Sequence, residues 1–232
     1  MRWPRFQRQP RGSGSDDHAR DRARMVAEQL ESRGIRDPEL LRAFRTVERH
    51  AFVDGVEPYG DHALPLGSGQ TISQPFVVAM MTAAARPDEG WRDAAVLEVG
   101  TGSGYQAAIL AELGARVVSI ERHASLASEA RDRLEHAGYA DRVQVVVGDG
   151  TQGWEAGAPY RSILVTAGGP SVPTPLTEQL EAAGGRLVMP VGDRHHQDLT
   201  LVVREGDEWR SKVLEPVVFV PLIGEHGYPE DG

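Results

Sequence analysis

The sequence predicts an α/β protein built on a doubly wound parallel sheet, with a helical cap before the sheet and an antiparallel hairpin after it. Short apolar runs alternate with amphipathic segments from residue 94 to residue 192, which is typical of a parallel sheet covered on both faces. A glycine-rich turn joins the first run to a helical segment. Two strand-like runs within residues 198–222, separated only by a Gly-Asp turn region, favour a hairpin at the sheet edge.

The composition narrows the function classes. The chain has 232 residues, 40% of them hydrophobic and 25% charged, which is ordinary for a globular protein. A net charge of -9 gives no general attraction to nucleic acid or anionic membrane, so we expect neither partner. No cysteine is present, which excludes disulfides, thiol nucleophiles and thiolate metal sites and fits a cytoplasmic location.

The N-terminal arm, residues 1–18, is basic and rich in Arg, Pro, Gly and Ser, and it predicts disorder rather than a secretory signal. Residues 19–232 are expected to form a single domain. Within it, 19–90 supply helices and a substrate segment, 91–192 a cofactor-binding core, and 193–232 the C-terminal strands.

The first elements after the arm are predicted to be helices. Apolar positions from Met25 to Leu30 indicate one that stops at Gly34. A second helix begins at Pro38, with Asp37 as its N-cap.

The next segment, "LPLGSGQTISQP" (64–75), is polar, glycine-rich and too short for a regular element. A third helix follows from about Pro75, with Ser73 as a candidate N-cap. Strands are then expected at 94–99, 115–121, 141–149, 160–168 and 184–192. The helices between them are expected at 105–113, 125–138 and 173–182.

The turn "LEVGTGSGYQ" carries Gly100, Gly102 and Gly104 after the acidic Glu98. It is not the dinucleotide fingerprint, because Tyr105 occupies the place of the third glycine, and no lysine makes it a phosphate loop. An acid at this strand end repels a pyrophosphate but suits a ligand with an ammonium group. S-adenosyl-L-methionine has one, together with a carboxylate for the helix N–H groups.

Acids also end the next two strands. Glu121 is placed to accept hydrogen bonds from ribose hydroxyls, and Asp149 to face an adenine amino group, since ligands of open α/β sheets lie beyond the carboxyl ends of the strands. The alternative is that Glu98 and Glu121 are only exposed acids at helix starts, favoured by the helix dipole.

Several strings, among them "GQTISQP", "VLEVGTGSGYQ", "VVVGDGTQGW" and "FVPLIGEHGY", together resemble the protein-L-isoaspartate O-methyltransferase family. The resemblance runs from Met25 to Tyr228, and "GQTISQP" is its most specific part. It implies a Rossmann-like methyltransferase fold and transfer of a methyl group from S-adenosyl-L-methionine to the free carboxylate of L-isoaspartyl residues. The ester then collapses to a succinimide, whose hydrolysis returns some normal aspartate. It also implies a monomer, isoaspartyl proteins or peptides as partners, and no metal.

The resemblance assigns roles by position. Ser73 falls on the active-site residue, although plain helix capping is the alternative for this serine. The expected substrate-binding residues are Gln70, Thr71, Ile72, Val220, Leu222 and Ile223. The expected cofactor-binding residues are Thr71, Glu98, Gly100, Thr101, Gly102, Ser103, Gly104, Glu121, Arg122, Asp149 and Gly150. A carboxylate acceptor is already ionised at neutral pH, so the chemistry requires orientation more than a strong base.

Three functions stay open at this point: general repair, a dedicated enzyme that esterifies a normal aspartate of one peptide to form aspartimide, and a non-catalytic S-adenosyl-L-methionine-binding module. The family often has other residues at Ser68 and at Gly168–Gly169, which affects the substrate pocket more than the cofactor site. The adjacent His195 and His196 suggest either a metal or a polar turn before a strand, and the lack of a third ligand favours the turn.

Overall fold

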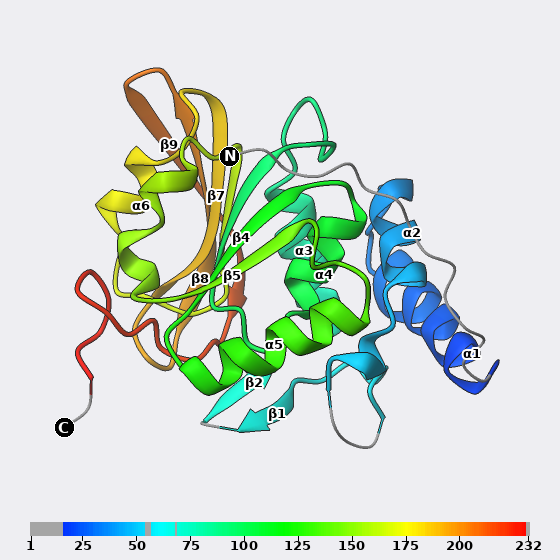
Figure 1. Cartoon of the computed structure of the whole chain (residues 1–232). Helices are drawn as coiled ribbons and strands as arrows, with labels where there is room; N and C mark the ends of the chain where they lie inside the picture. The colour runs from blue at the N-terminus through cyan, green and yellow to red at the C-terminus, as the bar shows by residue number, and fades with distance from the viewer. Residues whose placement is uncertain (1–15, 54–56, 68, 231–232) are drawn as a thin grey trace.

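A seven-stranded sheet runs through the molecule in the order β5-β4-β3-β6-β7-β8-β9 (Figure 1). The structure is a computed structural model that describes residues 16–53, 57–67 and 69–230. The strands of the sheet are β3 (Ala95–Val99), β4 (Arg116–Glu121), β5 (Val143–Val147), β6 (Ser162–Val165), β7 (Ala183–Gly192), β8 (Gln197–Glu205) and β9 (Glu208–Val217). Neighbouring strands pair in parallel along the row β5-β4-β3-β6-β7, whereas β8 is antiparallel to both β7 and β9. The predicted α/β class, parallel core and terminal hairpin are confirmed.

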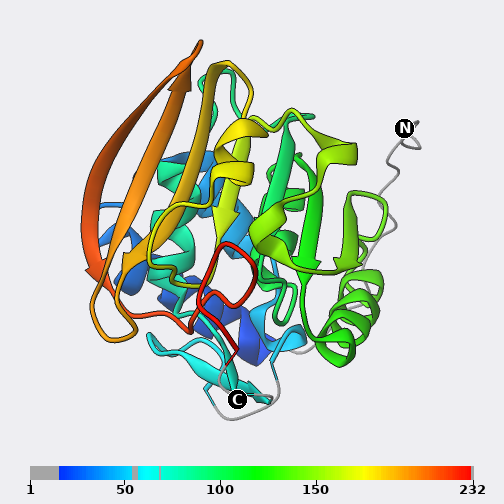
Figure 2. The same cartoon turned by 90° about the vertical axis from the view of Figure 1, so that its left-hand side faces the viewer.

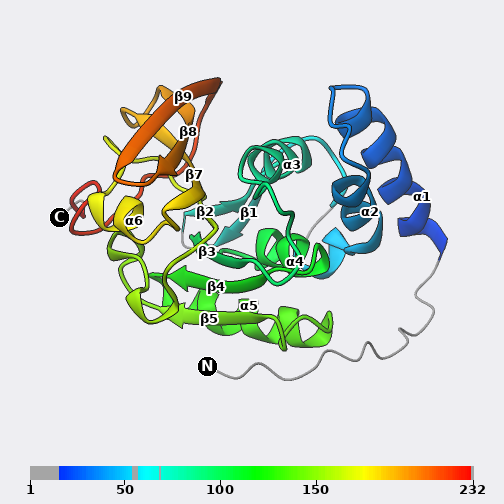
Figure 3. The same cartoon turned by 90° about the horizontal axis from the view of Figure 1, so that it is seen from above.

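Helices cover both faces of the sheet. Figure 3 shows α3 and α4 on one side and α6 on the other. The main helices are α1 (Asp16–Met25), α2 (Pro38–Thr46), α3 (Pro75–Ala84), α4 (Tyr105–Glu112), α5 (Ala124–His136) and α6 (Thr174–Glu178). The shorter helical segments are η1 (Val26–Glu31), η2 (Arg49–Ala51), η3 (Gly150–Gln152) and η4 (Glu155–Gly157).

Two apolar cores result from the alternation of side chains along each strand. On β3, Val96 belongs to the core beneath α3 and α4, while Leu97 and Val99 belong to the core beneath α6. This two-sided burial explains why the strands read as continuous apolar runs in the sequence.

The N-terminal helices form a further layer that packs on α3 and α4. Asp37 caps α2 as predicted, because its side chain accepts hydrogen bonds from the N–H groups of Glu39 and Leu40. Of the expected disordered arm, residues 1–15 lie outside the described residues, and residues 16–18 are helical. Helix α1 is joined to α2 at Arg22, whose Nε donates to the carbonyl of Arg45 at 2.7 Å.

Three local predictions were wrong. Residues 64–75 include a two-stranded antiparallel hairpin, β1 (Leu64–Gly67) with β2 (Gln70–Ile72). The helix expected over 173–182 ends at Glu178, because the backbone on either side of Leu180 pairs with Tyr160 instead. Gln74, not Ser73, holds the N-cap position of α3, and it makes no side-chain capping bond.

The sheet reverses its strand order at β3, since β4 and β5 lie on one side of it and β6 on the other. Such a switch point leaves a crevice beyond the carboxyl ends of the strands. Figure 2 shows the red C-terminal segment and the cyan β1–β2 hairpin close to this end of the sheet. Among the described residues, no helix is long and apolar enough to cross a membrane.

Candidate active site

A cavity of about 250 Å³ lies at the switch point, and segments from across the chain line it. The ends of β3, β4 and β6 contribute Glu98, Ile120 and Thr166. The β2 end and the C-terminal segment contribute further walls. Of the predicted site residues, the cavity brings together Gln70, Thr71, Ile72, Ser73, Glu98, Gly100, Thr101, Gly102, Ser103, Glu121, Arg122, Gly150, Val220, Leu222 and Ile223.

The glycine loop is shaped by left-handed backbone. Gly100 has φ +94°, and a Cβ there would collide with Thr166 Oγ1. Gly104 has φ +88° and is the N-cap of α4, so that the chain turns directly from β3 into the helix. Gly104 itself does not line the cavity and acts through this turn.

Glu98 is fully buried at the floor of the cavity. Its Oε2 accepts a hydrogen bond from Ser119 Oγ, and Ser119 in turn contacts Thr101 Oγ1 at 2.6 Å. Its Oε1 has no hydrogen-bond partner within the described structure. Burial raises the pKa of Glu98 to about 8, with a smaller contribution from the neighbouring charge of Glu121. The site therefore holds a buried carboxyl oxygen that the described protein leaves available to a ligand.

Glu121 is also buried, which overturns the alternative that these two acids are exposed helix-start residues. Its Oε2 accepts from the Gly102 N–H at 3.0 Å, and its Oε1 from the His123 N–H at 3.0 Å. The end of β4 thus fixes the loop that follows β3. The next residue, Arg122, lines the cavity and forms an ion pair with Glu230.

Asp149 lies outside the cavity, although its neighbour Gly150 lines it. Asp149 Oδ1 accepts from the N–H and the hydroxyl of Thr151, and Oδ2 accepts from the Glu225 N–H at 2.8 Å. Burial alone would raise the pKa of Asp149, but these hydrogen bonds outweigh it and lower the pKa. In this structure the carboxylate ties the C-terminal segment to the end of β5.

Ser73 follows β2 and is half-buried at the cavity wall. Since it does not cap α3, its hydroxyl is not occupied by the helix, and no hydrogen bond of this hydroxyl is found within the described parts of the chain. Its carbonyl accepts a hydrogen bond from Arg49 Nη2 at 2.8 Å. The serine is therefore held by its backbone while its side chain stays available.

The C-terminal wall is anchored by backbone pairing with the segment after β6. Gly168 N–H donates to the Val220 carbonyl at 2.8 Å, and Leu222 N–H donates to the Gly168 carbonyl at 2.7 Å. A Cβ at Gly168 would collide with the side chain of Gln197, which itself bonds both the N–H and the carbonyl of Phe219. The glycine thus makes room for the clamp that holds this wall. Ser68, the other departure from the family pattern, lies outside the described residues.

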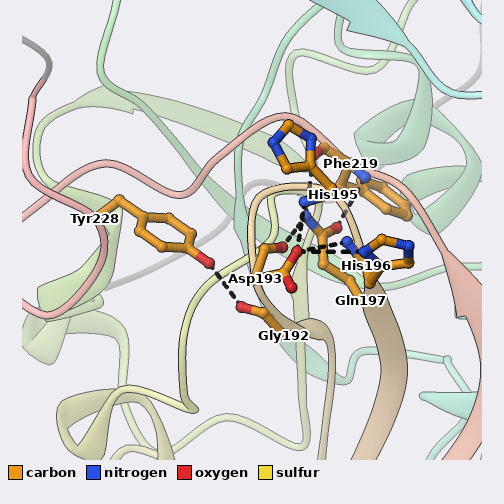
Figure 4. Close-up of polar contacts among 7 residues, drawn as sticks. All are labelled: Gly192, Asp193, His195, His196, Gln197, Phe219 and Tyr228. Atoms are coloured by element: carbon orange, nitrogen blue, oxygen red, sulfur yellow. Dashed lines mark hydrogen bonds and ion pairs between the residues drawn. The ribbon is translucent and has the colours of Figure 1, made fainter.

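Figure 4 shows this clamp and the turn before it. Asp193 Oδ1 accepts from the N–H groups of His195 and His196 at 2.7 and 2.8 Å. The two histidines therefore form the polar turn that the sequence favoured. Within the described ranges, no group of three or more His, Cys, Asp or Glu residues is arranged to hold a metal ion.

Sequence reasoning missed several lining residues, among them Tyr105, Gln106 and Thr166. Tyr105 and Gln106 are the first two residues of α4, directly after the glycine loop. Their position next to the loop is the sequence feature that could have predicted them as lining residues. Both carry a buried oxygen without a hydrogen-bond partner in the described chain, Tyr105 OH and Gln106 Oε1. Thr166 offers no such signal, because it reaches the site only through the pairing of β6 with β3.

Comparisons with known proteins agree with this geometry. A family model described as protein-L-isoaspartate(D-aspartate) O-methyltransferase matches residues 20–227. A protein from Methanoregula boonei named protein-L-isoaspartate O-methyltransferase is 51% identical over 211 residues, which cover 90% of this chain and 95% of that protein. One from Pelobacter propionicus, named protein-L-isoaspartate O-methyltransferase 2, is 53% identical over 209 residues, with coverages of 88% and 91%.

Solved structures give the same result for the fold. A protein-L-isoaspartate O-methyltransferase is similar with a TM-score of 0.78 and 26% identity, covering 89% of this chain and 67% of the other. A Plasmodium falciparum protein of the same description, solved in complex with S-adenosyl-L-homocysteine, has a TM-score of 0.75 and 21% identity, with coverages of 90% and 99%. At that identity, the second likeness supports the fold alone.

Proposed function

We propose, because the chain belongs to the protein-L-isoaspartate(D-aspartate) O-methyltransferase family, that it methylates the free carboxylate of L-isoaspartyl residues with S-adenosyl-L-methionine. The observation that carries this function is the shared cavity. The glycine loop with Glu98 forms one part of it, and Ser73 with the wall at 220–223 forms another. A donor and an acceptor bound there would meet in one enclosed space.

The donor side fits a ligand with an ammonium group. Glu98 offers a buried oxygen that lacks a partner in the described structure, and ionised Glu98 would pair with a cation. Glu121, Arg122 and Gly150 would hold the rest of the ligand along the ends of the neighbouring strands. When bound, S-adenosyl-L-methionine supplies a methyl group activated by its sulfonium centre. We assign Asp149 an indirect role, through the position of Gly150 and the C-terminal segment.

The acceptor side fits a carboxylate. The Ser73 hydroxyl is a hydrogen-bond donor at the cavity wall, and the neighbouring Gln70, Thr71 and Ile72 line the same space. A carboxylate is ionised at neutral pH and needs no general base to attack a methyl group. These residues therefore contribute by orienting the acceptor, a contribution that often dominates in bimolecular transfer.

The test is methyl transfer from labelled S-adenosyl-L-methionine to two peptides that differ only in L-isoaspartate or L-aspartate at one site. We expect transfer to the isoaspartyl peptide alone. Ser73→Ala should lower kcat/KM by about tenfold or more, as for loss of a hydrogen bond to a charged group. Ser211→Ala, an exposed serine on β9, is the matched control and should retain the full rate.

Other outcomes select other functions. Transfer to neither peptide, with S-adenosyl-L-homocysteine still bound, would overturn general repair. Transfer to a normal aspartate in one particular peptide would instead identify a dedicated maturation enzyme. The monomeric state and the cytoplasmic location stay predictions.

A further inference from the structure

Arg49 is a buried cation directly behind the acceptor wall. It is the first residue of η2 and has 0% exposure. Its Nε donates to the Pro58 carbonyl at 2.8 Å, and its Nη2 donates to the Ser73 carbonyl at 2.8 Å. One guanidinium thus joins the loop after η2 to the segment that carries the active-site serine.

The charge of Arg49 is not compensated by an ion pair within the described residues. Both hydrogen bonds with good geometry go to neutral carbonyl groups, and in the described chain the remaining Nη1 lies without such a bond next to Tyr105, whose ring the guanidinium faces. A buried charge is unfavourable unless it is paired and fully hydrogen-bonded. Burial accordingly lowers the pKa of Arg49, although an arginine keeps its charge at neutral pH. The nearby Asp61 and Tyr105 offset part of the cost of this burial without forming an ion pair with Arg49, so the guanidinium keeps its positive charge behind the acceptor wall.

The nearest space for an anion is the cavity. The Arg49 guanidinium carbon lies 4.9 Å from the ring centroid of Tyr105, and Tyr105 lines the cavity. Ser73, bonded to the same guanidinium through its carbonyl, lines the cavity as well. Because Arg49 is fully buried and contacts two residues of this wall, its attraction for an anion there is less screened than that of an exposed charge.

We propose that Arg49 is a positioning residue that fixes the backbone of Ser73 and whose buried positive charge makes this wall of the cavity selective for a carboxylate acceptor. The inference rests on the proposed function, because it takes the acceptor to be the free carboxylate of an isoaspartyl residue. Arg49 does not line the cavity itself, so its effect reaches the substrate through Ser73 and through the field across Tyr105.

The test compares two ligands in three proteins. One ligand is an isoaspartyl peptide, and the other is the same peptide with its free carboxylate replaced by an uncharged amide. Their dissociation constants are measured in the presence of S-adenosyl-L-homocysteine for the wild type, Arg49→Gln and Arg49→Lys. We expect the wild type to prefer the carboxylate by about tenfold or more, the size of one charge-assisted contact. Arg49→Gln should lose most of this preference, and Arg49→Lys should retain it with a lower kcat.

A purely structural role gives a different result. Looser packing would weaken both peptides equally, so an unchanged preference in Arg49→Gln would overturn the inference even if activity fell. If Arg49→Gln does not fold, the wild type and Arg49→Lys still decide, because a wild type without preference or a lysine variant that loses it contradicts the inference. Arg204→Met is the matched control. Arg204 also donates to backbone carbonyls, those of Glu178, Leu180 and Gly206, but it lies outside the cavity lining and should leave the preference unchanged.

The proposed function can fail separately. If the wild type transfers no methyl group to the isoaspartyl peptide but binds it with the expected preference, the reaction is wrong and the role of Arg49 stands. If transfer occurs without any preference for the carboxylate, the proposed reaction stands and the role of Arg49 is wrong.

Discussion

The end of β3 and the end of β5 look alike in the sequence and differ in the folded protein. Each strand leads to an acid shortly before a glycine, Glu98 before Gly100 and Asp149 before Gly150. Glu98 is fully buried in the cavity with one oxygen lacking a partner in the described chain, and its pKa is raised to about 8. Asp149 has both oxygens bonded by the protein itself, and its pKa is lowered.

This difference separates an acid kept for a ligand from one used by the fold. Asp149 is bonded on both oxygens and lies outside the cavity lining, so it has little left to offer a ligand there. A buried oxygen without a partner, as in Glu98, is unfavourable until something binds it. We therefore expect substitutions at the two positions to affect different properties of the protein.

The largest expected effect is on cofactor affinity. Glu98→Gln keeps the shape of the side chain but removes the charge that would pair with the ligand ammonium group. We expect the Kd of S-adenosyl-L-homocysteine to rise by about a hundredfold, as for loss of a buried charge partner. Asp149→Asn should change it by less than about tenfold, and titration calorimetry measures both. Equal effects would show that the two acids do not differ in role.

The next effect is on the pH dependence of stability. The carboxyl of Glu98 has an ordinary pKa of 4.5 when unfolded and about 8 when folded. Between these values the folded protein holds a proton that the unfolded chain has released. The contribution of Glu98 to the free energy of unfolding is therefore fully present below pH 4.5. It falls between pH 4.5 and 8, by up to roughly 1.4 kcal/mol per pH unit, and is lost once the pH has risen through 8.

Urea unfolding of the ligand-free protein from pH 5 to pH 8 measures this slope. Glu98→Gln should flatten it. Asp149 acts in the opposite sense, since its lowered pKa contributes stability that is lost only as the pH falls through the acid range. A slope that persists unchanged in Glu98→Gln would assign it to other groups.

A smaller effect is expected from removing the contacts of Asp149. Asp149→Ala deletes the bonds to Thr151 and Glu225, so the free energy of unfolding should fall by about 1–2 kcal/mol. Urea unfolding at neutral pH measures the loss. An unchanged free energy of unfolding together with a large rise in the Kd of S-adenosyl-L-homocysteine would show instead that Asp149 binds the cofactor directly.

The smallest effect is expected at the ion pair between Arg122 and Glu230. The Glu230 side chain is 75% exposed, and exposed ion pairs contribute at most about 1 kcal/mol. Glu230→Gln should change the Kd of S-adenosyl-L-homocysteine by less than about threefold at moderate salt. A larger change, measured by the same calorimetry, would add Glu230 to the cofactor site in which Arg122 is already expected.

The sequence predicted features that depend on residues close together in the chain better than contacts between remote segments. The glycine loop, Glu98 and the strands around them follow from local spacing, because Glu98 and the glycines after it are near neighbours in the sequence. Glu121 was placed correctly at its strand end, but its bond to the Gly102 N–H depends on how β4 sits beside β3.

Contacts between remote segments left no local pattern. Asp149 bonds Glu225 and Arg49 bonds Ser73, and neither pairing has a periodicity or a capping signal in the chain. The alternative prediction for Ser73, that it caps α3, was wrong for a related reason. A serine two residues before Pro75 matches a capping pattern, but the chain enters α3 one residue later than that pattern requires.

The origin of the cavity walls has a consequence for synthesis on the ribosome. The glycine loop, the ends of β3 and β4 and the segment at 70–73 are made early, but the wall at 220–223 follows β9. Domains fold as the chain emerges at about 5–20 residues per second, so the parallel sheet has seconds in which to form before that wall exists. The growing chain can therefore acquire most of its core while its cavity stays open on one side. Ligand binding becomes available as one of the last events of folding.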